Sequence, residues 1–433
     1  MTRIRVHILA VVFLLLLASP GSAFDPLATY HQYDYVILVH DSLLSEAQRL
    51  CAHRAESLRS CVVLTSEVTA AFDGATDVEK IRAFVLYAYE QLKIAPTYLL
   101  LVVDMNMVDA PSSEMIDVPS GNLLPAKLIY NDFASWQGNR LFPDDGWYVA
   151  PPDTFGKKPI MRVGRLAVTD SGQLANVVDK IIYYEGIAGT PAWLDRILML
   201  VGDANINTNN EIYRTLNDQL FDEEFSAWSP TPATLYSRDY QVAGEWPEGA
   251  TAATRAAFNY GYGYVNAFGN TESENNLVLM AQFFPSGEPT FTKSLSGSNY
   301  LPVVFAGSCL PCYYYRSQSA VSICDDLLTS TNDRGAIALV AASHVNDIIE
   351  SKQLNGAFAH MMLHDGVRDM GQLFSGSVGS CLEEDAGHEQ MLRQYMLMGD
   401  PALQLRVPSV PPMRELRQGM EIGDAAVLQD HVS

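Results

Sequence analysis

The stretch LPVVFAGSCLPCYYY, residues 301–315, decides how the rest of the chain is interpreted. Its apolar run at 303–305 is typical of a buried strand, and the small residues that follow lead to a cysteine, Cys309. In open α/β sheets, ligands and chemistry gather at the carboxyl ends of the strands. Cys309 is therefore a candidate nucleophile. Judged by residue type alone, a cysteine is more often a small buried side chain or half of a disulfide.

Strands and helices alternate on both sides of this stretch. We expect strands at residues 33–41, 61–65, 97–104, 159–170, 195–202, 233–237, 264–268, 302–306, 335–342 and 402–407. We expect helices at residues 42–58, 78–93, 171–185, 210–228, 251–260, 321–330, 354–364 and 390–398. The alternation predicts an α/β fold with mostly parallel sheets. Residues 105–159 are rich in Pro, Gly, Asn and Asp, and we expect them to be loop-like.

The chain begins like an exported protein. Arg3 and Arg5 precede an apolar run at 6–18, and small residues follow at 21–23. This pattern predicts a signal peptide and a secreted, periplasmic or extracellular location, with no membrane attachment once the signal is removed. A natural linker at 186–190 completes the division of the chain. We expect a signal peptide at 1–23, an N-terminal α/β subdomain at 24–190, a C-terminal subdomain carrying the site at 191–408, and a polar tail at 409–433.

Charge excludes some partners. The formal net charge is −22, and it becomes −24 without residues 1–23, which carry two arginines and no acid. Such a surface repels nucleic acid and anionic lipid, so we expect neither as a partner. The acidic residues serve solubility or bind calcium. We expect no other cofactor. The oligomeric state is not predicted.

All six cysteines lie after the expected signal: Cys51, Cys61, Cys309, Cys312, Cys324 and Cys381. An even count in an exported chain favours disulfides, and a bridge between Cys51 and Cys61 would join a helix to the strand that follows it. Cys309 and Cys312 form a Cys-x-x-Cys after a strand, which is compatible with a thiol-disulfide protein or a local bridge. A bridged Cys309 would not act as a nucleophile.

Three fragments together point to a known family. They are PIMRVGRLAVTD at 159–170 followed by KIIYYE at 180–185, YLPVVFAGSC at 300–309 followed by SICDDLL at 322–328, and YMLMGDPALQL at 395–405. In this order and spacing the chain resembles the gingipain family of secreted cysteine peptidases, which share the caspase fold. The resemblance implies two α/β subdomains with the chemistry in the second, hydrolysis of peptide bonds by a cysteine thiolate, and a peptide or protein as substrate or ligand.

The histidine motif of that family is altered in this chain. The family pairs its cysteine with the histidine of a Gly-His-Gly motif, and the corresponding stretch here reads VNAFGNTES at 265–273. Cys309 matches the nucleophile and Gly269 the first glycine, while Asn270 replaces the histidine and Thr271 the second glycine. An asparagine amide cannot act as a general base, and losing that role typically costs ~100- to 10,000-fold in rate. The comparison therefore implies a degenerate peptidase that binds a peptide or partner, with Thr271 still offering a backbone N–H to an oxyanion.

An active peptidase with a relocated base is the alternative. His344 follows the expected strand at 335–342, which should lie beside the Cys309 strand, at a spacing of about 4.8 Å. By resemblance, Ser343 would help to wall the specificity pocket and Asp203 would be the acid that orients the histidine. Whether the chain is an enzyme stays open at this point.

Three other histidines are weaker candidates. His40 ends the first expected strand and belongs to the other subdomain. His360 and His364 lie one helical turn apart, a spacing that can hold a metal with a third ligand. Since the sequence shows no partner motif for the pair, a solvated helix face is the favoured explanation, and no metal ligand is assigned.

Overall fold

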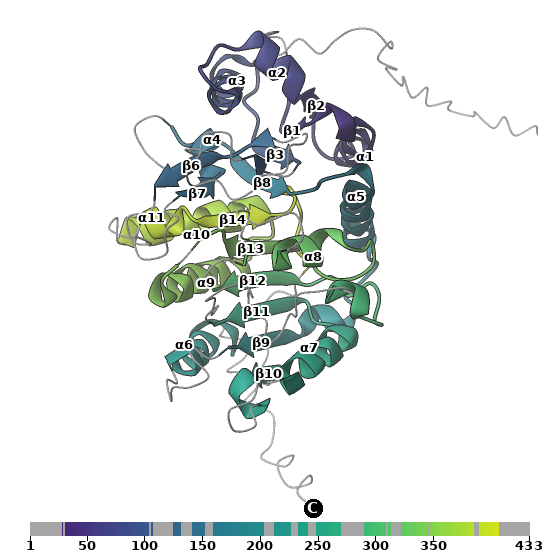
Figure 1. The fold of residues 1–433 in the computed structure, drawn as a ribbon, viewed down its shortest axis with the longest axis vertical. Coiled ribbons are helices and arrows are strands. Elements are labelled where there is room, and N and C mark those ends of the chain that lie inside the picture. The colour runs from purple at the N-terminus through teal and green to yellow at the C-terminus, as the bar shows by residue number, and fades with distance from the viewer. Residues whose placement is uncertain are drawn as a thin grey trace, which may run out of the picture.

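Apolar runs of four or five residues build one mixed sheet through the computed structural model (Figure 1). The structure describes residues 28, 31–103, 105–106, 124–130, 141–151, 159–202, 212–226, 233–240, 248–269, 290–308, 311–312, 322–344, 346–384 and 389–406. Within these ranges the sheet has ten strands. From one edge to the other they are β10 (Ala233–Tyr236), β9 (Ile197–Val201), β11 (Tyr264–Phe268), β12 (Val303–Gly307), β13 (Ala338–Ala342), β14 (Tyr395–Met398), β8 (Arg162–Leu166), β3 (Tyr98–Val102), β1 (Tyr35–Val39) and β2 (Ser60–Leu64).

The sheet contains two groups of parallel strands that run in opposite directions. Strands β10, β9, β11, β12 and β13 pair in parallel, and β14 pairs antiparallel with β13. On its other side β14 pairs in parallel with β8, which continues in parallel through β3 and β1 to β2. The carboxyl ends of β11, β12 and β13 therefore lie at the opposite end of the sheet from the carboxyl end of β1.

Helices cover both faces of the sheet (Figure 1). One face carries α1 (Leu44–Arg54), α5 (Ser171–Gly186), α8 (Ile323–Thr329) and α7 (Glu248–Tyr260), and the other carries α3 (Asp77–Gln91), α4 (Gly146–Val149), α10 (Met370–Glu384), α9 (Ile348–Leu363) and α6 (Ile212–Leu220). Shorter helical elements are α2 (Thr65–Ala71), α11 (Glu389–Leu392), η1 (Asp41–Leu43), η2 (Ala192–Asp195), the π-helical turn η3 (Phe221–Phe225), η4 (Ser237–Tyr240) and η5 (Thr292–Ser294).

Short polar side chains fix where several helices begin. Asp170 accepts a hydrogen bond from the backbone N–H of Gln173 at the start of α5, and Asp347 accepts one from Ile349 at the start of α9. These caps satisfy backbone donors that have no partner within the helix. Helix α5 therefore begins where the sequence indicates, at Ser171, whereas α9 begins at Ile348, six residues before the expected start.

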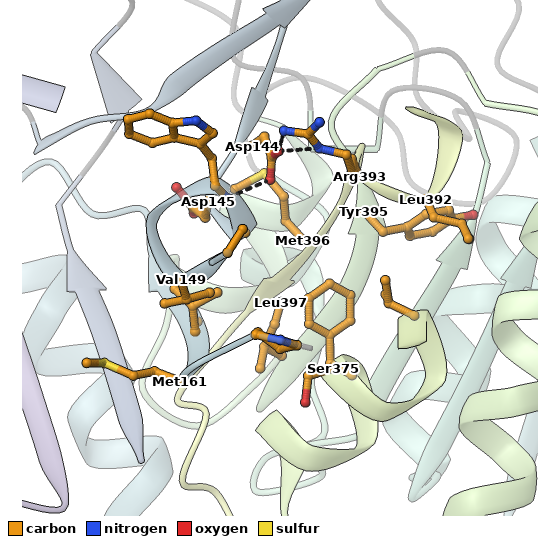
Figure 2. Close-up of a pocket in the computed structure, with 18 residues that line it drawn as sticks. Asp144, Asp145, Val149, Met161, Ser375, Leu392, Arg393, Tyr395, Met396 and Leu397 are labelled. Carbon is orange, nitrogen blue, oxygen red and sulfur yellow. Dashed lines mark hydrogen bonds and ion pairs between the residues drawn. The ribbon is translucent and has the colours of Figure 1, made fainter. Parts of the chain in front are cut away.

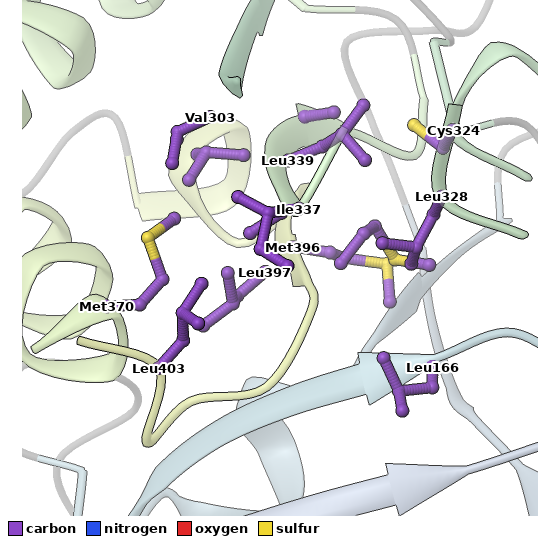
Figure 3. Packing of buried hydrophobic residues seen from close by; sticks show 14 of the residues in the cluster. Leu166, Val303, Cys324, Leu328, Ile337, Leu339, Met370, Met396, Leu397 and Leu403 are labelled. Atoms are coloured by element: carbon purple, nitrogen blue, oxygen red, sulfur yellow. The ribbon is translucent and has the colours of Figure 1, made fainter. Parts of the chain in front are cut away.

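The hydrophobic core lies on both sides of β12, β13 and β14. Figure 3 shows Leu339 and Leu397 from neighbouring strands together with Leu403 from the segment after β14, and all three are buried. Because both faces of these strands are covered, their sequences are almost continuously apolar rather than alternating. The strand that leads to Cys309 is thus held rigidly on both faces.

Three predictions about the C-terminal part are wrong. Residues 395–398 form the strand β14, although we expected a helix at 390–398, of which only α11 forms. Among residues 402–406 the structure has a single bridge, between Asp369 and Gln404, in place of the expected strand. Helix α10 was not expected, because its sequence is rich in Gly and Ser. A run of four apolar residues does not distinguish helix from strand, and the position between β13 and β8 decides it.

The segment at 105–159 is more ordered than expected. Its described residues form the pairs β4 (Met105–Asn106) with β5 (Leu124–Pro125) and β6 (Lys127–Tyr130) with β7 (Leu141–Asp144), followed by α4. The prediction of a loop is therefore wrong for these parts of the segment.

The linker expected at 186–190 follows directly after α5. Strands from both sides of it join one sheet through β14 and β8, so the division into an N-terminal and a C-terminal subdomain stays a prediction. In the ranges that the structure describes, no helix combines the length and hydropathy needed to cross a membrane.

Candidate functional site

The candidate site lies where β11, β12 and β13 end side by side. Phe268 pairs with Gly307, and Ala306 pairs with Ala341. Beyond the paired residues, the N–H of Gly269 donates to the carbonyl of Gly307 over 3.3 Å. Because the three strands are parallel, the segments that leave them all emerge at this end of the sheet. The structure therefore brings Gly269, Ser343 and His344 to the same end.

Two glycines make this close arrangement possible. A Cβ on Gly269 would lie 2.9 Å from the Cα of Gly202, which follows β9. A Cβ on Gly307 would lie 2.5 Å from the Phe268 ring. Real Cβ atoms do not approach their neighbours so closely, so both positions need glycine for packing. Gly307 in the sequence AGSC is thus explained by its neighbour on β11, independently of any chemistry.

The segment after Cys309 crosses the end of β13. The N–H of Cys312 donates to the carbonyl of Ala342 over 3.1 Å, and Cys312 forms a disulfide with Cys324 at the start of α8. Since Cys312 has a single sulfur, the suggested local bridge between Cys309 and Cys312 is wrong for this structure. The structure also contradicts the suggested bridge between Cys51 and Cys61, both of which are unbridged thiols.

Ser343 has a structural position. It is fully buried, its N–H donates to the carbonyl of Gln394 over 2.8 Å, and its hydroxyl lies 3.0 Å from the same carbonyl and 3.3 Å from that of Pro143. The hydroxyl therefore joins β13 to β7 and to the segment before β14. His344 comes next and is also buried, with 2% of its surface exposed.

A cluster of two acids and two arginines connects β8 to the segment before β14. Arg165 on β8 donates to both carboxylate oxygens of Asp145, at 2.7 and 2.6 Å. Figure 2 shows Arg393 donating to Asp144, over 2.8 Å. Burial raises the pKa of Asp144, and the charge of Arg393 opposes that effect. In the sequence, Asp144 and Asp145 indicated only a turn, because their partners are distant along the chain.

A small cavity of about 60 Å³ lies beside this cluster. Figure 2 shows Val149, Met161, Tyr395 and Leu397 around it. Pockets for small ligands typically have volumes of roughly 300–1,000 Å³. The cavity is too small for such a ligand, so we treat it as a packing gap.

The remaining predicted residues fall in three groups. Cys309, Asn270, Thr271 and Asp203 lie outside the described residues. His40 lies at the carboxyl end of β1, at the other end of the sheet, where its Nδ1 accepts from the N–H of Ser42. His360 and His364 lie on α9 next to Glu224, a partner that the sequence did not indicate.

Comparisons with known proteins agree with this architecture. Residues 28–406 match the family model described as Peptidase family C25. The crystal structure of the Arg-specific cysteine proteinase gingipain R matches with a TM-score of 0.66 and 18% identity, covering 90% of this chain and 81% of that chain. The complex of Porphyromonas gingivalis RgpB pro- and mature domains matches with a TM-score of 0.61 and 18% identity, covering 87% and 80%.

A further solved structure, described as a protease, matches with a TM-score of 0.61 and 13% identity, covering 86% of this chain and 78% of that chain. No curated protein matches the sequence. At these identities the structural likeness shows the fold, and it confirms the expected caspase-like α/β architecture.

Proposed function

The chain belongs to Peptidase family C25, and on that premise we propose that it binds peptides at the carboxyl ends of β11, β12 and β13 but hydrolyses them slowly or not at all. The position of Gly269 carries this proposal. Its hydrogen bond to Gly307 attaches the first residue of the altered motif to the strand that leads to Cys309. Asn270 follows Gly269 directly, at the motif position where the family has its histidine.

The chemistry of the two residues explains the slow hydrolysis. A cysteine attacks a peptide bond as a thiolate, and a neighbouring imidazole both favours the thiolate and protonates the leaving amine. The amide of Asn270 does neither. In this proposal Cys309 keeps its thiol and the backbone N–H of Thr271 binds the peptide carbonyl, while Gly269 holds this segment against Gly307. Asp203, which follows Gly202, has no histidine to orient.

The expected ligand is an exported or extracellular peptide. The signal-like residues 1–23 support export, and the net charge of −22 favours encounters with basic peptides through electrostatic steering. The charge sets the rate of encounter and does not define a side-chain pocket.

An active peptidase with His344 as the base is the second candidate, because one observation favours it. Val303 pairs with Ala338 and Ala306 with Ala341, an offset of 35 positions. In this register His344 follows the end of β13, beside the strand that leads to Cys309, and neighbouring strands are about 4.8 Å apart. Against this candidate stands the burial of His344, which leaves only 2% of its surface open to solvent.

Covalent labelling separates the two candidates. The purified chain is treated, without reductant, with acyloxymethyl ketone probes that carry basic and neutral peptides, and the labelled residue is located by mass spectrometry. Our proposal predicts slow labelling of Cys309 and a rate increase of ~100- to 10,000-fold in Asn270→His, because the general base is restored.

The controls assign each outcome. Cys309→Ala should abolish labelling, and its affinity for a fluorescent basic peptide should remain measurable by anisotropy. Fast labelling of the unmodified chain that is lost in His344→Ala would replace our proposal by the second candidate. A Cys309→Ala chain that binds no peptide, together with an Asn270→His chain that gains no reactivity, would exclude a peptide site at these strand ends.

A further inference from the structure

Three side chains from two helical elements meet on the surface, away from the strand ends. His360 and His364 lie on α9, and Glu224 lies on the π-helical turn η3. One carboxylate oxygen of Glu224 lies 3.2 Å from Nδ1 of His360 and 3.4 Å from Nε2 of His364. The three potential ligand atoms all lie within 4.8 Å of one another.

These separations suit a shared cation. Zinc binds imidazole nitrogen at about 2.0–2.1 Å and carboxylate oxygen at about 2.0–2.2 Å, usually with tetrahedral geometry. Ligand atoms at the corners of such a tetrahedron are roughly 3.3 Å apart, by the geometry of those bond lengths. The two distances to Glu224 already have this value. Only the distance between the two histidine nitrogens needs to adjust, and both nitrogens belong to side chains that can rotate.

The backbone holds the three ligands in register. His360 and His364 are one turn apart on α9, and their rings stack with centroids 4.8 Å apart. Lys352, two turns earlier on the same helix, donates to Glu223 over 2.7 Å and so attaches η3 along α9. Widened π-helical turns occur frequently at functional sites. Here the turn places Glu223 beside Lys352 and Glu224 beside His360 and His364.

We propose that Glu224, His360 and His364 bind a divalent transition-metal ion, with zinc as the expected occupant. Two imidazoles and one carboxylate favour zinc over calcium, which prefers oxygen ligands. The side chain of His360 is 55% exposed, so an ion reaches the site directly from solvent and keeps water at its remaining positions. The acidic chain also attracts cations to its surface.

The ion would cross-link η3 to α9. His360 is 12 residues beyond Ile348, the first residue of α9, and therefore about 18 Å along the helix from the end nearest His344. At that distance the ion takes no part in chemistry at Cys309. Its expected effect is to stabilise the packing of α6 and η3 on α9, independently of the proposed peptide site.

Calorimetric titration of the untagged, chelator-treated chain with zinc chloride near neutral pH tests the proposal. We expect one strong site per chain, with affinity reduced by more than ~10-fold in Glu224→Gln and in His360→Ala, since even indirect partners of metal ligands contribute that much. Asp222→Asn is the matched control, because it removes the same charge from an exposed side chain two residues away and should bind zinc like the unmodified chain. Cobalt should show the visible absorption of a tetrahedral ion in the unmodified chain and lose it in Glu224→Gln.

Thermal melting distinguishes lost ligands from lost structure. All variants should unfold cooperatively in the presence of chelator, and zinc should raise the Tm of the unmodified chain and of Asp222→Asn only. Equal zinc affinity in Glu224→Gln and the unmodified chain would overturn the proposal. So would the absence of zinc binding, which would leave these contacts as simple ion pairs between histidine and glutamate.

Discussion

Single residues at the strand ends have roles that their residue types do not reveal. Ser343, predicted to wall a specificity pocket, uses its hydroxyl to contact the carbonyls of Gln394 and Pro143. Gly307 and Gly269 are glycines because neighbouring atoms fill the space that a Cβ would need. These three residues therefore serve packing and hydrogen bonding at the strand ends.

Replacing Gly307 by alanine should destabilise the protein. The new Cβ would lie 2.5 and 2.8 Å from atoms of the Phe268 ring, and overpacking of this kind typically costs ~1–3 kcal/mol. Urea unfolding measures the change. Gly186→Ala is the control, because nothing lies within 4 Å of a Cβ at the end of α5. Equal stability of the two variants would contradict the packing explanation for Gly307.

At the scale of elements, α5 and α8 are joined by a buried lysine. Lys180 on α5 is fully buried, and its ammonium nitrogen donates to the carbonyls of Leu327 and Leu328 at 2.9 and 2.8 Å. Burial lowers the pKa of Lys180 to about 7, and the charges of Asp326 and Asp333 oppose this shift. The carbonyl of Ala336 accepts a third, longer hydrogen bond of 3.3 Å from the same nitrogen.

This pKa predicts a pH dependence of stability. Above about pH 7 the folded state has released the proton of Lys180, while the unfolded chain keeps it up to its ordinary pKa of 10.5. The unfolded state then binds more protons, so the free energy of unfolding should rise with pH in this window, by up to ~1.4 kcal/mol per unit. Urea unfolding at several pH values measures the slope, and Lys180→Met, which does not titrate, should lack this contribution. Identical slopes in both proteins would refute the lowered pKa.

The disulfide at the start of α8 is a second link between elements. It closes a loop with a sequence separation of 12 between Cys312 and Cys324. In the chain-entropy model, a disulfide that closes a loop of this size raises the free energy of unfolding by ~3 kcal/mol. We expect the double variant Cys312→Ser, Cys324→Ser to have a lower Tm under oxidising conditions and the same Tm as the reduced unmodified chain. An unchanged Tm under oxidising conditions would show that the bridge does not stabilise the fold.

At the scale of the whole molecule, a buried polar network joins distant parts of the chain. Asp400 accepts from Tyr35 of β1 over 2.9 Å and from Arg54 of α1 over 2.9 Å, and Arg54 also donates to Glu185 at the end of α5. Burial raises the pKa of Tyr35, and the charge of Asp400 adds to that effect. Asp400 and Glu185 belong to the fragments that carry the family resemblance. These two residues of the fragments therefore stabilise the fold and take no part in the proposed chemistry.

Removing Asp400 should weaken the molecule as a whole. Asp400→Ala leaves the buried Arg54 with Glu185 as its remaining acid partner, and breaking a buried ion pair typically costs ~3–5 kcal/mol. Since one sheet runs through both halves, far-ultraviolet circular dichroism and tryptophan fluorescence should report a single, shifted unfolding transition. Two separate transitions would instead support the predicted division at residues 186–190.

The sequence by itself determined the α/β fold and most of the strand positions. These features depend on local apolar runs and on residue order, which are visible along the chain. Only the tertiary structure decided that residues 395–398 form β14, that Cys312 pairs with Cys324, and that Glu224 lies beside His360. Each of these depends on which distant segments become neighbours. That choice is made by the packing of the whole sheet and its helices, because residues far apart in sequence carry no local signal of their contact.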